Sequence, residues 1–318
     1  MGYRLLTCRV ALLGLLLLAG QAMATNYVAD ANMRGLPVCI GGSWTKSNSN
    51  SVYTCPGQVT LRSGDTISSS SAVTLQAAGF SITGATIGSA GAPITIEAGS
   101  SGISGTGTSS FSASVSSSGN VQLGTATIGE SLTAGGSITL GGGSVRGAVS
   151  SSSGSVQLAS VAVSGSITAN SGAITISGGS VGGNVSSASN PVQLTDVSVT
   201  GGVSAGGKIT LTGGTVTGLV ESGCCDVVTN GTNLEGGARS GSSSLSITGG
   251  TVRGDFSAVN NPATFSNVTM ISGTVVAGSI SFSGSTAGSS AAPVTMTSRY
   301  NAISLSGSQV YGDRKSVV

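Results

Sequence analysis

The central part of this chain repeats one pattern four times, and this repetition constrains its fold more than any other feature. Three copies begin with the letters VQL at Val121, Val156 and Val192, and a more diverged fourth copy begins at Val227. The copies follow one another at steps of 35, 36 and 35 residues. Self-similarity at a fixed period of about 20 to 50 residues is typical of repeat architectures, in which each unit packs against its neighbours. We therefore expect a stacked structure.

Apolar residues within each copy recur at offsets of +2, +5, +7, +11 and +13 from the starting valine. Pairs of apolar residues two apart indicate strands, because alternate residues of a strand share one face. A helix would repeat them at spacings of three and four. Three short strands with their corners account for about 17 to 18 residues, so each copy corresponds to two turns of a coil. In the third copy the pattern falls on Leu194, Val197, Val199, Val203 and Ala205.

The fold that this spacing predicts is all-β: a three-sided parallel β-helix, or β-solenoid, with about 17 to 18 residues per turn and an N-terminal cap. It is predicted to occupy residues 67–312 in about 14 turns, stacked about 4.8 Å apart. Glycine pairs such as Gly213-Gly214 are expected at corners, because glycine adopts positive φ at little cost. A β-sandwich fits less well, because its strands usually have about 5 to 6 residues and are joined by hairpins.

The composition is unusual for a folded protein and needs an explanation. The chain of 318 residues contains 53 glycines, and 7% of its residues are charged, whereas about 25% is ordinary. Low hydrophobicity without pattern would indicate disorder. Here the valines, isoleucines and threonines are regularly spaced, which favours an ordered fold with serine, threonine and glycine on its outside.

Residues 1–24 are predicted to be a signal peptide. Arg4 and Arg9 precede the apolar run 10–19, and a small-x-small cleavage pattern ends at Ala24. The run has ten residues, and a membrane span needs roughly 20. Removing two of 12 basic residues leaves 10 against 10 acidic ones, a net charge of about zero. We expect an exported protein, in the periplasm, on the outer surface or outside the cell, with no membrane span after cleavage.

The segment 25–66 differs from the repeats and is predicted to cap the solenoid, whose end would otherwise expose unpaired strand edges. It holds Trp44 between Cys39 and Cys55. Export permits disulfides, and we predict one between these two cysteines. It would close a loop of about 15 residues, worth on the order of 3 kcal/mol. Residues 313–318 are expected to form a tail.

Cys224 and Cys225 are adjacent in the sequence. A disulfide between neighbouring residues is geometrically demanding. The sequence leaves three outcomes open: a disulfide between the two, two reduced thiols, or a bond to another chain.

Few residues of this sequence are candidates for catalysis. The chain has no histidine, which is the commonest general acid or base, and serine needs a base beside it to act as a nucleophile. Carboxylates could act in pairs on a glycosidic bond, and Glu221, Asp226 and Asp255 are the candidates. We predict no enzyme activity, cofactor or metal site. A polysaccharide-acting β-helix enzyme is the weaker alternative.

Partner classes are also limited by charge. Nucleic-acid binding relies on clustered lysine and arginine, and no such cluster is visible in the sequence. We therefore predict that nucleic acid is not a partner.

The repeats resemble those of bactofilins, which are bacterial polymer-forming β-helix proteins. The similar units are GGSITLGGGSVRGAV from Gly135, AITISGGSVGGNV from Ala173 and GGKITLTGGTVTGLV from Gly206. The resemblance covers the solenoid alone and implies possible end-to-end self-association. Bactofilins are cytoplasmic and lack an export signal, so their cytoskeletal role is not implied for this chain.

The segment from Cys39 to Ile67, CIGGSWTKSNSNSVYTCPGQVTLRSGDTI, followed by glycine- and serine-rich repeats, is similar to the N-terminal region of MshQ-like proteins. These are exported proteins associated with the mannose-sensitive haemagglutinin pilus. The resemblance implies surface or pilus proteins as partners, and further domains beyond Val318 in a longer form. It implies no catalytic residues.

Three functions follow as expectations. The first is an exported, non-enzymatic stalk or surface module linked to a pilus or adhesin. The second is a scaffold that polymerises end to end. The third and weakest is the polysaccharide-acting enzyme.

Overall fold

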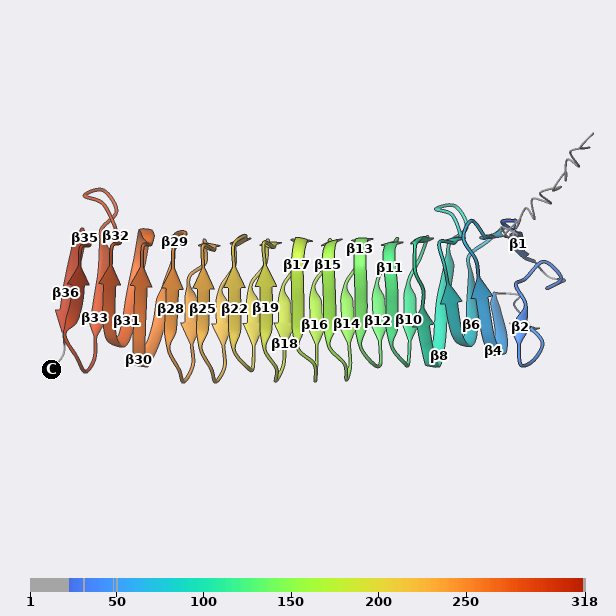
Figure 1. Ribbon diagram of the computed structural model, residues 1–318, viewed down its shortest axis with the longest axis horizontal. Helices are drawn as coiled ribbons and strands as arrows, with labels where there is room; N and C mark the ends of the chain where they lie inside the picture. The colour runs from blue at the N-terminus through green and yellow to red at the C-terminus, as the bar shows by residue number, and fades with distance from the viewer. Residues whose placement is uncertain (1–22, 31, 48, 50, 317–318) are drawn as a thin grey trace, which may run out of the picture.

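The chain forms an all-β rod in a computed structural model that describes residues 23–30, 32–47, 49 and 51–316 (Figure 1). Parallel strands stack as a β-solenoid of about 15 turns, and all the described strands belong to one hydrogen-bonded sheet. The prediction of an all-β solenoid is confirmed. Its three-sided cross-section and its cap remain predictions. Most of the predicted signal peptide, residues 1–22, lies outside the described residues.

One series of paired residues, the Val121 series, runs through the repeats. Val121 pairs with Ile138, which pairs with Val156, and the series continues one residue per turn. The starting valines of the copies therefore lie in register along the stack, in alternate turns. Each member of the series is almost fully buried, because the turns on both sides cover it. The later members are Ile174, Val192, Ile209, Val227 and Leu245.

Two further series of parallel pairings run along the stack. The Ile128 series continues through Val145 and Val163, and the Leu132 series continues through Val149 and Ile167. The side chains of all three series point inward and belong to one continuous apolar core. The alternation of inward and outward residues within each strand is the physical cause of the spacing seen in the sequence.

The corner between the Val121 and Ile128 series explains why the repeat spans two turns. Val161 is buried there and pairs with Gly143 in the turn before it and Gly179 in the turn after it. Gly179 has φ +87°, and a Cβ built on it would lie 2.2 Å from the carbonyl oxygen of Val161. A side chain fits at this corner only in every second turn, so the sequence alternates with a period of two turns.

The N-terminal strands already join the stack within the segment predicted to be a cap. Strands β1 and β4 pair in parallel with β5 and β6, whereas β2 and β3 pair antiparallel with β4. The strands of this region are β1 (Asn26–Ala29), β2 (Cys39–Ile40), β3 (Thr45–Lys46), β4 (Val52–Leu61), β5 (Thr66–Ser69), β6 (Val73–Ile82), β7 (Thr86–Ile87), β8 (Ile94–Ser104), β9 (Thr108–Phe111) and β10 (Val115–Ser117).

The central strands are short and evenly stacked, as Figure 1 shows. They are β11 (Val121–Ile128), β12 (Leu132–Ala134), β13 (Ile138–Val145), β14 (Val149–Ser151), β15 (Val156–Val163), β16 (Ile167–Ala169), β17 (Ile174–Val181), β18 (Val185–Ser187), β19 (Val192–Thr195), β20 (Ser198–Val199), β21 (Val203–Ala205), β22 (Ile209–Thr212), β23 (Thr215–Val216), β24 (Val220–Ser222), β25 (Val227–Asn230), β26 (Asn233–Leu234), β27 (Ala238–Ser240) and β28 (Leu245–Thr248).

The C-terminal strands continue the same stack with longer, irregular members. Register shifts occur where β30 pairs with β31, between Ala258 and Pro262. The strands are β29 (Thr251–Arg253), β30 (Phe256–Ser266), β31 (Thr269–Ser283), β32 (Thr286–Ala287), β33 (Val294–Ser298), β34 (Ile303–Ser306), β35 (Gln309–Val310) and β36 (Gly312–Ser316).

Some serines lie inside the rod, contrary to the expectation that serine lies on the outside. Ser151 is fully buried, and its hydroxyl donates to the carbonyl oxygen of Gly136 at 2.8 Å. The same hydroxyl accepts from the backbone nitrogen of Gly154 at 3.0 Å. A buried hydroxyl is tolerated when it is hydrogen-bonded, and here it ties one turn to the previous one. Ser187, Ser222 and Ser240 donate in the same way to Gly172, Gly207 and Cys225.

Candidate functional site

The three carboxylates that the sequence singles out lie in different surroundings. Glu221 is on β24, where its side chain forms an ion pair of 3.5 Å with Arg239 of the next turn. Both side chains are about half exposed, at 44% and 57%. Exposed pairs of this kind contribute about 0 to 1 kcal/mol. Asp226 and Asp255 precede β25 and β30, so they lie at corners, each on the approach to a different strand series.

Asp226 bonds to the following turn. Its Oδ1 accepts from the backbone nitrogen of Ser244 at 3.1 Å and from the hydroxyl of Ser243. The Ser243 hydroxyl, followed by the Ser244 amide, lowers the pKa of the Asp226 carboxyl; desolvation opposes this effect, and Lys208 adds a smaller lowering. A lowered pKa keeps this group ionised and accepting hydrogen bonds at neutral pH.

Asp255 makes the same kind of contact at another corner. Its Oδ1 accepts from the backbone nitrogen of Thr274 at 3.1 Å and from the Thr274 hydroxyl at 2.6 Å. Asparagines do this elsewhere: the Oδ1 of Asn120 accepts from Ser137, and that of Asn184 accepts from Gly202, both at 2.8 Å. The two aspartates therefore take part in a bond between turns that neutral amides also make.

Cys39 and Cys55 are joined by a disulfide, with their Cα atoms 5.7 Å apart. Cys39 lies on β2, Cys55 is buried on β4, and the two strands pair antiparallel. Trp44, in the loop between them, donates its indole N–H to the carbonyl oxygen of Pro37 at 2.6 Å. The disulfide thus fastens the antiparallel segment to the first parallel turns.

Cys224 and Cys225 are also joined by a disulfide in the structure, with Cα atoms 3.7 Å apart. The sequence left open a disulfide between the two cysteines, two reduced thiols or a bond to another chain, and the structure has the disulfide between the two. The Cys225 backbone nitrogen donates to the hydroxyl of Ser222 at 3.0 Å. Gly154 and Asn190 make the equivalent bond at other corners. The corner itself therefore does not require cysteine, and the disulfide is an added feature of an ordinary turn.

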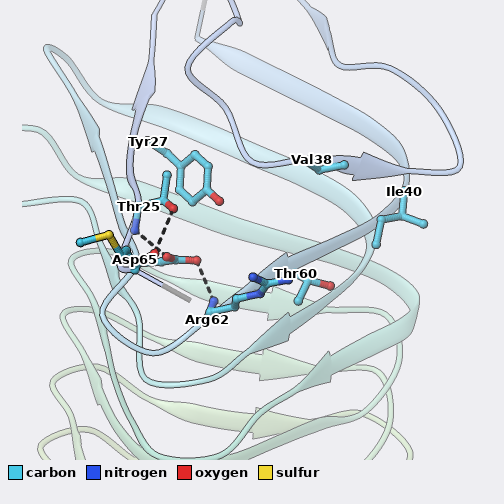
Figure 2. A pocket seen from close by; sticks show the side chains of 8 residues that line it. Thr25, Tyr27, Val38, Ile40, Thr60, Arg62 and Asp65 are labelled. Atoms are coloured by element: carbon cyan, nitrogen blue, oxygen red, sulfur yellow. Dashed lines mark hydrogen bonds between the residues drawn. The ribbon is translucent and has the colours of Figure 1, made fainter. Parts of the chain in front are cut away.

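A hollow of about 360 Å³ lies at the N-terminal end of the rod (Figure 2). Asp65 is one of the residues that line it and is 2% exposed. Its two oxygens accept backbone hydrogen bonds from Thr25 at 2.8 Å and from Arg62 at 2.7 Å. Sequence reasoning did not select Asp65, because one aspartate in a turn has no distinguishing pattern. The hollow is lined by Met23, Thr25, Tyr27, Val38, Ile40, Thr60, Arg62 and Asp65.

No group of three or more Cys, Asp and Glu side chains among the described residues could hold a metal ion. Within those residues, no helix has the length and apolarity needed to cross a membrane.

Comparison with known proteins finds no matching family model, no similar curated protein and no similar solved structure. The likeness to MshQ-like proteins and bactofilins therefore stays a prediction from the sequence.

Proposed function

We propose that this protein is an exported, non-enzymatic β-solenoid that serves as a stalk or surface module, with pilus or adhesin proteins as its partners. The observation that carries the proposal is the unbroken stack of about 15 parallel turns around one apolar core. Such a structure extends in one dimension, because each turn contacts only its neighbours. Length and stiffness are the properties that a stalk needs.

The hydrogen bonds of the carboxylates support the absence of catalysis. Asp226 and Asp255 bridge successive turns in the way that Asn120 and Asn184 do. One oxygen of each, Oδ1, is thus already used to hold successive turns together. Glu221 is paired with Arg239 on the surface. A polysaccharide-acting enzyme would need two of these groups directed at one bond of a substrate.

The disulfides support export. Two pairs of cysteines are bonded in the structure, and disulfides persist mainly in oxidising compartments. This agrees with the leader-like residues at the start of the sequence.

The test is to express the full chain with a C-terminal tag in a bacterial host and to fractionate the cells. We expect tagged protein outside the cytoplasm, beginning at Thr25 by mass spectrometry and accessible to protease on intact cells. A matched variant, Leu16→Arg, interrupts the apolar run and should keep the protein inside with its leader. Finding the unchanged chain in the cytoplasm with residues 1–24 intact would refute export. Hydrolysis of a glycan panel, lost in Asp226→Asn or Asp255→Asn, would refute the non-enzymatic role.

End-to-end association of copies of this chain is the second candidate. It is favoured by the last described turns, where Ile303 and Leu305 are half-buried, whereas their partners Ile280 and Phe282 in the preceding turn are buried. A second copy could continue the parallel pairing there. Light scattering should then show mass rising with concentration. Leu305→Lys should abolish the rise, and Ser304→Lys, on the exposed side of the same strand, should preserve it. A constant monomer mass rejects this candidate.

A further inference from the structure

Asp65 is 2% exposed, and its carboxylate takes part in no ion pair within the described part of the chain, although Arg62 lines the same hollow. Its two recorded donors are the backbone nitrogens of Thr25 and Arg62. Burying an ionised carboxylate is costly unless a positive charge and hydrogen bonds compensate it. The two hydrogen bonds are present, and no cation of the described residues lies within ion-pair distance.

Thr25 is held in place by residues that follow it in the chain. Its carbonyl oxygen accepts from the backbone nitrogen of Thr66 at 2.9 Å. Strand β1 begins at the next residue and pairs in register with β5, Asn26 opposite Thr66. Ala29 at the end of β1 is buried in the core. The nitrogen of Thr25 donates to Asp65, as a dashed line in Figure 2 marks. Because the contacts that position Thr25 come from residues that follow it, we expect this nitrogen to keep its place when the preceding residues are removed.

The bond before Thr25 is open to a peptidase. Met23 is 91% exposed, Ala24 is exposed, and neither belongs to a strand. The small-x-small pattern of the sequence ends at Ala24, which places the predicted cleavage between Ala24 and Thr25. The nitrogen released by the predicted cleavage and the nitrogen that Asp65 binds are thus the same atom.

We propose that Asp65 is the receptor for the new N-terminus made by this cleavage. A leader-removing peptidase adds water across the Ala24–Thr25 peptide bond. Ala24 departs with the carboxylate, and the nitrogen of Thr25 stays as an ammonium group at the position where its amide already meets Asp65 at 2.8 Å. The hydrogen bond between an amide and a carboxylate becomes a part-buried ion pair that fastens β1 to the first turn of the rod. This inference rests on the proposed export and processing.

An ammonium group adds a Coulomb attraction to the carboxylate that a neutral amide donor does not supply. Asp65→Asn removes the charge and keeps one acceptor oxygen; the NH2 group that replaces the other oxygen faces a backbone donor in both forms of the chain. The loss of stability that Asp65→Asn causes at β1 should therefore depend on whether the nitrogen of Thr25 is an ammonium group or an amide. This dependence separates a receptor for the N-terminus from a carboxylate that merely stabilises the turn.

The experiment compares four purified full-length mature proteins. Two begin at Thr25 and two retain Met23 and Ala24, each pair carrying Asp65 or Asp65→Asn. Hydrogen exchange of the β1 amides is followed for each protein. We expect Asp65→Asn to speed exchange about tenfold more in the Thr25-starting form than in the extended form, as a double-mutant cycle measures coupling between contacting groups. Asp30→Asn is the matched control, because Asp30 is exposed and should show no such coupling. Equal effects of Asp65→Asn in both forms overturn the proposal.

A second measurement covers the case in which Asp65→Asn does not fold. The α-amine of the unmutated Thr25-starting protein should react with an acylating reagent at least tenfold more slowly when folded than in urea. Equal rates overturn the proposal.

The experiments distinguish a failure of the proposed export from a failure of the proposed ion pair between Asp65 and the N-terminus. Protein isolated from cells with its leader intact refutes the processing, whatever the cycle shows. Protein that begins at Thr25 but shows no coupling to Asp65 refutes the pair and leaves export standing.

Discussion

The middle of the rod and its two ends fill the same core with different side chains. From Val121 to Arg253 the sequence has no aromatic residue, and the Val121 series advances at a nearly constant step, from Val121 to Ile138 to Val156. Nearer the ends some steps are longer, as from Phe80 to its partner Ile103. The longest strands also lie there: β31 has 15 residues, and β8 and β30 have 11 each.

The two regions fill the core in different ways: the ends use large aromatic rings, and the middle uses small aliphatic side chains. Phe265 lies between Phe256, an edge-on neighbour at 5.5 Å, and Phe282, a stacked neighbour at 4.4 Å. Phe265 itself keeps the regular register, from Ile247 to Phe265 to Phe282, so the rings add bulk to the core without leaving the stack. The middle relies on small aliphatic side chains, and these pack only if every corner keeps the same path. The middle should therefore be sensitive to corner geometry, and the ends to side-chain volume.

Phe265→Ala should have the largest effect of the changes that test this comparison. Removing a buried ring costs about 3 to 5 kcal/mol of folding free energy. Because each turn contacts only its neighbours, the loss should be confined to the C-terminal turns. Hydrogen exchange should show residues 256–306 opening while residues 121–216 stay protected. If the whole rod lost its protection from hydrogen exchange together, the ends and the middle would not be separate in stability, contrary to this expectation.

Gly179→Ala should destabilise the middle by about 2 kcal/mol, because a positive φ costs a residue with a Cβ about 1 to 2 kcal/mol. The new methyl group would also meet the carbonyl oxygen of Val161. Gly223→Ala is the control, because its Cβ would meet nothing closer than 3.7 Å. Chemical denaturation followed by circular dichroism measures both. If both changes lowered the stability equally, the backbone geometry of the corner would not be what determines the stability of the middle.

Thr229→Val should stabilise the protein by about 1 to 2 kcal/mol, because it removes a buried hydroxyl that lacks a partner. Thr229 and Thr232 stand in the fourth copy where the third copy has leucine and valine, and both are 1% exposed. Their hydroxyls have no hydrogen-bond partner among the described residues. Thr212→Val, at an exposed position of β22, should be nearly neutral. An unchanged denaturation midpoint for Thr229→Val would contradict this expectation.

Asp226→Asn should have the smallest effect, a loss of about 0.5 to 1 kcal/mol at neutral pH. The folded pKa of Asp226 is lowered, so the stability it contributes is present above its unfolded pKa of about 3.9 and is lost as the pH falls through the folded value. The denaturation midpoints of the variant and the unchanged protein should therefore converge in acid. A difference that stays constant down to about pH 2, below the unfolded pKa, would show that the charge of Asp226 is not involved.

Much of the stack could be predicted from the repeats, but the polar interior could not. Serine occurs at both exposed and buried positions, and only the neighbouring turn decides which is which. Ser151 is internal because Gly136 and Gly154 present backbone groups to it. Asp65 is buried because Thr25, 40 residues away in the chain, lies against it. No local pattern encodes either contact.

By itself, the sequence determined that the chain is a β-solenoid with two turns to each repeat. Alternating aliphatic residues can bury only one face of a strand, and their fixed period allows one turn to stack on the next. Only the tertiary structure decided at which corners a side chain has no room, as at Gly179. It alone also decided which carboxylates accept hydrogen bonds from another turn. Those properties depend on the backbone of the adjacent turn, which comes close to a residue only after the coil has formed.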